Sequence, residues 1–257
     1  MPRRSTWRFF IRAPWPLLFG ASGIGYALVA VGIGDDSAMA AICRGSGALD
    51  SAGVWSDPAG RTFDSAYGSL LAGWALMLLA MMPPLLASPL MHVWRSSMRR
   101  NRLSVVAEFV LGYWAAWTAA GAVLIGGAAV LRVVAPATAF SLVLLVALVW
   151  SSSPWQRAAF NRGHRQRRIS LFGLAAHRDA FAFGARHGAW CVATCWAWMM
   201  LPLVSGPYHV PVMVLVGVVM LAERLTMPRQ SGWRLPVATQ WLANALPAMS
   251  AAERVRR

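Results

Sequence analysis

Long runs of apolar residues alternate with short polar segments along the chain. A helix needs roughly 20 consecutive apolar residues to cross the hydrocarbon core of a bilayer. The pattern predicts six such helices, at residues 14–34, 66–91, 103–131, 134–152, 180–204 and 208–223. The predicted fold class is therefore an all-α, polytopic membrane helix bundle, and residues 1–257 form a single integral membrane domain. The first apolar run is long enough to span, so we expect an uncleaved helix there.

Prolines interrupt two of these predicted spans. Pro83 and Pro84 lie inside the second span, and Pro202 lies near the end of the fifth. Proline has no amide hydrogen, so we expect a kink or break at each position. In a membrane, the freed carbonyl groups must find partners in neighbouring helices or water.

Charge then fixes the expected orientation. The chain is 58% hydrophobic and only 13% charged, yet its net charge is +15, and every basic residue is arginine. Of the 24 basic residues, only Arg44, Arg61 and Arg132 fall on one side of the predicted spans. Arginine-rich loops stay in the cytoplasm. Both termini are therefore predicted to be cytoplasmic, with the protein in the bacterial inner (plasma) membrane.

The same distribution limits the partners. Few polar residues remain to solvate a surface, and orientation already accounts for the charge, so a nucleic-acid partner is not expected. The expected partner is the lipid bilayer, whose anionic headgroups attract basic loops. Residues 153–179 are predicted to form the longest inner loop, and residues 226–257 a cytoplasmic tail with an amphipathic helix at 235–250.

Sulfur side chains are the main candidates for chemistry. His187, Cys191, Cys195 and Met199 follow each other at intervals of four residues in the fifth span, so they share one slowly drifting helix face. Thiolate and thioether ligands favour Cu(I). A second set lies directly before the paired prolines, at Met77, Met81 and Met82. Together the two sets predict a soft-metal site inside the membrane.

The same stripes also have a packing interpretation, because Met fills irregular cores and Cys behaves as a small buried hydrophobe. Ionisable residues near the span ends have structural interpretations too. We expect Glu108 to pair with Arg102, and Arg186 and His187 to reach the inner interface. No H-E-x-x-H, C-x-x-C-H, P-loop or G-x-S-x-G motif is present in the sequence, so no enzyme is predicted.

Several motifs resemble a bacterial family of predicted metal-binding integral membrane proteins, a domain of unknown function. The resemblance covers residues 70–225, and its marks are WALMLLAMMPP, FVLGYWAAW, SSSPWQRAAFNRGHR, GARHGAWCVATCWAWMM and VGVVMLAERL. It implies metal binding. Relatives typically carry a cysteine pair in the inner loop, where this chain has Ala159 and Gly163, and adjacent cysteines where Thr194 precedes Cys195. The resemblance thus implies that a cytosolic thiolate relay is lost here.

The leading hypothesis is an inner-membrane protein that binds or hands over a soft metal, most plausibly copper, without catalytic turnover, with a metal-donor or metal-acceptor protein as partner. The expected ligands are Cys191, Cys195, Met81 and Met82, followed by His187, Met77 and Met199. Two alternatives stay open: a non-catalytic membrane scaffold or assembly subunit, and a small-solute or ion transporter. The sequence does not assign a role to Cys43.

Overall fold

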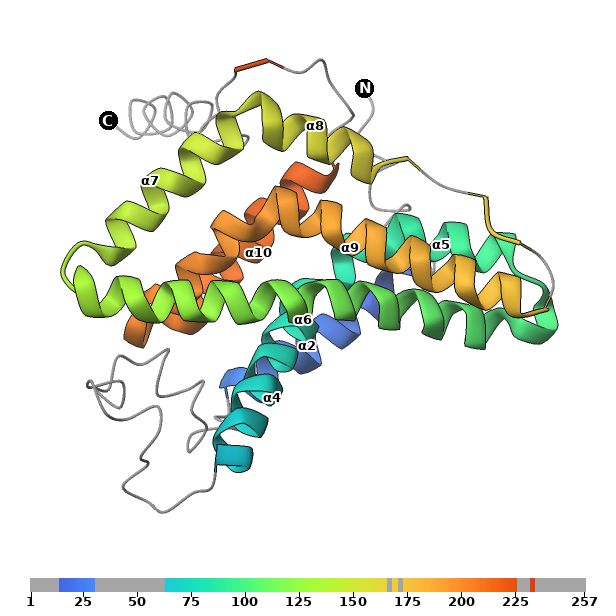
Figure 1. Cartoon of the computed structure of the whole chain (residues 1–257), viewed down its shortest axis with the longest axis horizontal. Coiled ribbons are helices and arrows are strands. Elements are labelled where there is room, and N and C mark those ends of the chain that lie inside the picture. The colour runs from blue at the N-terminus through green and yellow to red at the C-terminus, as the bar shows by residue number, and fades with distance from the viewer. Residues whose placement is uncertain (1–13, 31–62, 166–167, 171–172, 226–231, 234–257) are drawn as a thin grey trace, which may run out of the picture.

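A computed structural model of the chain describes residues 14–30, 63–165, 168–170, 173–225 and 232–233 (Figure 1). Within these residues the regular structure is helical, which confirms the all-α prediction for this part of the chain. The α-helices are α2 (Trp15–Ala30), α4 (Phe63–Met81), α5 (Ala87–Ser96), α6 (Arg102–Val134), α7 (Ala139–Ser152), α8 (Pro154–Gly163), α9 (Gly173–Val204) and α10 (His209–Leu225). Three short 3-10 turns join them, at η1 (Pro83–Leu86), η2 (Arg99–Asn101) and η3 (Gly206–Tyr208).

The described helices differ in their capacity to cross a membrane. Three segments are long and apolar enough, namely Arg99–Val134, Gly173–Val204 and Gly206–Leu225. The number rises to five if each of two sharply bent helix pairs counts as one span. Helix α2 is apolar but has only 16 residues. The count of six spans and the membrane embedding therefore stay predictions, as does the orientation. Cys43 and the expected amphipathic helix at 235–250 lie outside the described residues.

The paired prolines break the second predicted span, as the sequence indicates. Helix α4 ends at Met81, and the chain turns through η1 into α5, with a bend of 59°. The amide of Met82 still donates to the Leu78 carbonyl at 2.9 Å, but the next residues are prolines and donate nothing. Met82 therefore lies at the break itself, where the backbone changes direction.

Two other expectations about helix ends are corrected. The segment 153–179 is not one loop, because Ser153 caps the new helix α8 by accepting a hydrogen bond from the Gln156 amide at 3.2 Å. This helix bends 67° away from α7. Pro202 does not end α9 where it stands, since the helix continues to Val204. The Pro202 carbonyl then accepts a hydrogen bond from the Ser205 hydroxyl at 2.8 Å.

Helices α6 and α9 run side by side and form the most extensive helix contact in the described structure (Figure 1). Glycines let their backbones touch. A Cβ atom added at Gly112 of α6 would collide with the Phe181 carbonyl, and one at Gly184 of α9 would collide with the Phe109 carbonyl. At Gly188 an added Cβ would lie 2.9 Å from the Tyr113 carbonyl. Close approach through small residues is a common way for membrane helices to pack.

The remaining helices surround this pair. Helices α7, α8 and α10 pack against α9, whereas α2 packs against α4 and the η1 turn. The buried core has members from α4, α5, α6, α7, α9 and α10, and it contains both described cysteines and all four candidate methionines. The candidate site residues are thus buried where α4, η1, α6 and α9 meet.

Candidate metal site

Two sulfur atoms from distant parts of the chain meet at the hydroxyl group of Tyr113. The hydroxyl lies 3.3 Å from the Sδ atom of Met82 and 3.3 Å from the Sγ atom of Cys191. Met82 comes from the proline break, Tyr113 from α6 and Cys191 from α9. All three side chains are almost fully buried. The structure therefore brings together one methionine and one cysteine from the two predicted sulfur sets.

Cys195 joins this arrangement from the next turn of α9. Cys191 and Cys195 are four residues apart on α9, so their side chains lie on the same face of the helix. Thr194 lies beside them, with its hydroxyl 2.9 Å from the Cys191 carbonyl and 3.4 Å from the Cys195 Sγ atom. We call Met82, Cys191 and Cys195 the sulfur cluster. Thr194 stands where the resemblance implies a cysteine, so a hydroxyl replaces a potential thiolate next to the cluster.

The aromatic wall of the cluster has an unused hydrogen-bond donor. Trp117 lies one turn after Tyr113 and is fully buried. Its indole nitrogen has no hydrogen-bond partner among the described residues. Its backbone carbonyl accepts a hydrogen bond from the Trp74 indole at 3.1 Å. Buried aromatic side chains of Trp74, Tyr113 and Trp117 therefore lie together in this part of the core.

The other candidate methionines are placed less directly. Met77, Met81 and Met199 are buried in the same core as the cysteines. In the described part of the chain, no hydrogen bond links them to either thiol. No group of three or more His, Cys, Asp or Glu side chains is arranged to hold a metal ion among the described residues. The donor set that the structure assembles consists of two thiols and one thioether.

His187 does not reach the inner interface as expected. It is buried, because α9 begins at Gly173 and has already completed several turns before His187. Its Nε2 atom lies 2.9 Å from Arg224 Nη2. A guanidinium group only donates hydrogen bonds, so Nε2 accepts and the ring proton resides on Nδ1. His187 is thus engaged by Arg224 and not turned to the sulfurs.

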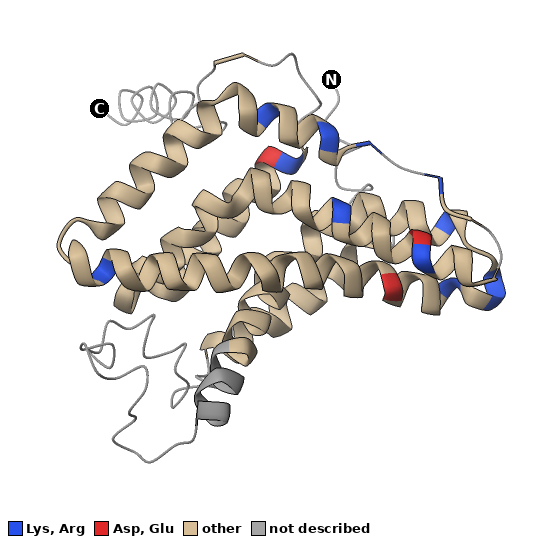
Figure 2. Ribbon diagram, viewed as in Figure 1, with Lys and Arg blue, Asp and Glu red and all other residues tan. Residues whose placement is uncertain are grey.

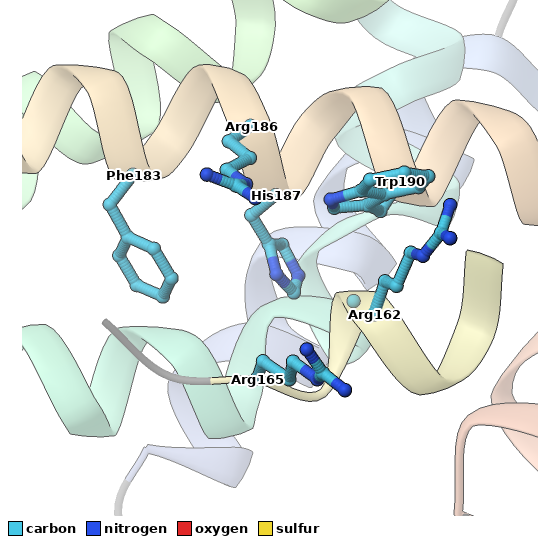
Figure 3. Close-up of a pocket in the computed structure, with 7 residues that line it drawn as sticks. Arg162, Arg165, Phe183, Arg186, His187 and Trp190 are labelled. Carbon is cyan, nitrogen blue, oxygen red and sulfur yellow. The ribbon is translucent and has the colours of Figure 1, made fainter. Parts of the chain in front are cut away.

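A basic pocket opens beside His187, between α9 and the end of α8 (Figure 3). Its volume is about 540 Å³. The residues that line it are Arg162, Gly163, Arg165, Phe183, Arg186, His187 and Trp190. In Figure 3, His187 and Trp190 extend from α9 toward Arg162 and Arg165. We call it the arginine pocket. Gly163, one of the two positions where relatives carry cysteine, lies in its wall.

His164 follows Gly163 at the end of α8 and is half-buried. Its Nδ1 atom lies 2.9 Å from the Phe160 carbonyl. Burial lowers the pKa of His164 below its usual value, and the positive charge of Arg224 lowers it further. His164 is therefore a neutral donor to the backbone at physiological pH.

The expected pairing of Glu108 with Arg102 is wrong. Glu108 lies 3.9 Å from His177 of α9, because α9 starts early and runs past this part of α6. Arg102 donates instead to the Ser97 carbonyl at 3.1 Å. Glu223 of α10 is buried and accepts a hydrogen bond from Gln156 of α8 at 3.4 Å.

Sequence reasoning missed three residues of the site: Tyr113, Trp117 and Arg224. A tyrosine between a glycine and a tryptophan in an apolar helix carries no metal-ligand signal. The only available hint was its place in the FVLGYWAAW motif.

The described structure is thus an all-helical protein with a buried sulfur cluster. Residues 71–247 match the model of the PpoB2 family, described as copper chaperones. The match covers more than half of the chain, so the chain belongs to this family. The match confirms that the chain belongs to a metal-related family, and it identifies the metal of that family as copper. No curated protein and no solved structure matches the chain.

Proposed function

We propose that the chain is a membrane-embedded copper chaperone that holds Cu(I) as cargo at the sulfur cluster and passes it to a partner protein without catalytic turnover. Membership of the copper chaperone family supports the cargo. The observation that carries the site is the contact of one hydroxyl, that of Tyr113, with both Met82 and Cys191 sulfurs.

The chemistry of the donors fits this cargo. Cu(I) is soft and prefers thiolate and thioether ligands to oxygen or nitrogen ligands. Cys191 and Cys195 supply the thiolates and Met82 supplies the thioether. The thiols lose their protons when the metal binds, so loading releases protons. Cu(I) between two thiolates has a net charge of −1, one unit less than that of the two thiolates alone.

Membrane insertion is part of the proposal and is supported by the outer surfaces. Large apolar side chains face outward on several long helices, among them Val123 with 74% of its surface exposed and Leu215 with 63%. Figure 2 shows most arginines of the described residues on α8, on α9, near the end of α5 and at the start of α6, whereas Arg132 lies near the opposite end of α6 and α7 has none. That distribution supports the inner membrane, with the arginine-rich side in the cytoplasm.

The test is the copper content of the purified protein, isolated from cells grown with copper. Wild type is compared with a Cys191→Ser/Cys195→Ser double variant and with Cys43→Ser as the matched control. We expect copper in wild type and in the control, and its loss from the double variant. Wild type without copper would overturn the proposal in favour of a scaffold, and full copper in the double variant would place the site elsewhere.

A further inference from the structure

The arginine pocket has the size and lining of a small-molecule site. Its volume of about 540 Å³ lies within the usual range for ligand pockets. Two of its walls are aromatic, Phe183 and Trp190. Arg162 and Arg165 come from the end of α8, and Arg186 comes from α9, so the charged groups approach from both sides.

The positive charge of the pocket is not balanced from within. None of the lining residues that the structure describes is acidic. Among the described residues, none of the three lining arginines forms an ion pair; Arg162 instead stacks over the Trp190 ring at 5.2 Å. Arginine presents planar pairs of donors that match the two oxygens of a carboxylate or phosphate. Several such groups around one concave site attract a polyvalent oxyanion.

The pocket also borders the sulfur cluster. His187 lines the pocket, and its ring centre lies 6.2 Å from that of Tyr113, whose hydroxyl contacts Met82 and Cys191. Arg224 lies at the same wall, where a Cβ atom added at Gly163 would come within 3.5 Å of Nη1. A molecule in the pocket is therefore separated from the thiols by only two side chains.

We propose that the arginine pocket binds a small molecule through its carboxylate or phosphate oxygens and holds it beside the sulfur cluster. If the bound molecule takes part in copper loading, that role rests on the proposed function. The binding of an oxyanion in the pocket does not depend on it.

The test measures binding without copper. The full chain is placed in nanodiscs of phosphatidylcholine and titrated by calorimetry with S-methylglutathione, which has two carboxylates and no free thiol, and separately with inorganic phosphate. A second set of discs contains phosphatidylglycerol, so that a lipid headgroup can occupy the pocket. The pocket variant is Arg162→Gln/Arg186→Gln. Its matched control is Arg99→Gln/Arg100→Gln, which removes the same charge from exposed positions outside the pocket.

If a soluble anion occupies the pocket, a probe binds in phosphatidylcholine discs and the pocket variant weakens it by at least about tenfold, as expected for lost charge-assisted hydrogen bonds. If a lipid headgroup occupies the pocket, phosphatidylglycerol binds there or displaces the probe. The pocket variant should weaken this binding in the same way. Either result supports the oxyanion site. Absence of both, or equal effects of the pocket and control variants, overturns it. Because copper is absent throughout, failure here leaves the copper-content test unaffected.

Discussion

The hydroxyl of Tyr113 lies 3.3 Å from the Sγ atom of Cys191, across the contact between α6 and α9. The same hydroxyl lies 3.3 Å from Met82, so one O–H group faces two sulfur atoms and has one proton to share between them. Without metal, this contact holds the cysteine and the methionine at a common point. With Cu(I) bound, the sulfur lone pairs are needed for the metal, so the hydroxyl and the metal compete.

This competition predicts the effect of Tyr113→Phe. Loss of the hydrogen bond should lower the free energy of unfolding of the metal-free protein by about 1 kcal/mol. The affinity for Cu(I) should rise by about fivefold, because the same contact no longer has to be broken on loading. Competition with a Cu(I) chelator measures the affinity. Tyr208→Phe, an exposed tyrosine at the start of α10, is the control and should change neither quantity. Weaker copper binding in Tyr113→Phe would instead make the phenol oxygen part of the site.

Glycine at position 184 is predicted to be essential for the helix contact. An alanine Cβ there would collide with the Phe109 backbone, which cannot move aside as a flexible side chain can. We expect Gly184→Ala to lower stability by about 1–3 kcal/mol, the usual cost of overpacking. Because α6 and α9 carry Tyr113 and Cys191, copper retention should fall with it. Unfolding in detergent and copper content are the measurements.

The control for this substitution lies on α6 itself. An alanine Cβ at Gly126 would meet no atom within 4 Å. Gly126→Ala should therefore keep copper binding and gain up to about 1 kcal/mol from helix propensity. Equal losses in the two variants would show that any added methyl disturbs the protein, and would contradict the proposed role of the close contact.

Local features of the sequence predicted the all-α class and the break at Pro83 and Pro84, but not helix α8. Apolar runs and the missing amide hydrogen of proline have local effects on the backbone, so they can be recognised from a single sequence. The convergence at Tyr113 is different, because it joins residues 31 and 78 positions apart. It depends on how closely α6 and α9 approach each other at their glycines. The periodicity of apolar residues contains no information on that distance.

His187 shows why the expected position of a polar side chain failed. The hydropathy pattern places the start of the fifth span at residue 180, close enough for His187 to reach the interface. Helix α9 starts at Gly173 instead, so His187 lies well inside it. Arg224 reaches across from α10 to meet it. A local hydropathy pattern does not show how far a helix extends beyond its apolar stretch. It also does not show which residue of another helix will be the partner.

Met82 and Met81 are equivalent candidates in the sequence, but the structure separates them. Of these two methionines, only Met82 accepts a hydrogen bond from the Tyr113 hydroxyl. Met82→Leu keeps the volume of the side chain and removes the thioether. We expect its Cu(I) affinity to fall by at least about tenfold, the loss seen even for supporting residues of metal sites. Stability should change by less than about 1.5 kcal/mol.

Two controls accompany this variant in the same chelator competition. Met220→Leu changes an equally buried methionine on α10 and should leave the affinity unchanged. Met81→Leu should have a much smaller effect than Met82→Leu. A larger effect of Met81→Leu would move the thioether ligand to the last residue of α4 and contradict the geometry at Tyr113.

His164 predicts how stability depends on pH. Burial and the charge of Arg224 from α10 lower its pKa, and His187 of α9 is the other titratable group that faces it. The unfolded chain therefore binds a proton more readily than the folded one between the two pKa values of His164. Stability should be fully present above about pH 6.5, the pKa of an unperturbed histidine, and should fall as the pH drops below it. His164→Gln cannot titrate and should show a smaller decrease between pH 7.5 and about pH 5.5 in denaturant unfolding. The comparison with His92→Gln on α5 tests specificity, since an equal flattening in that variant would remove His164 as the cause.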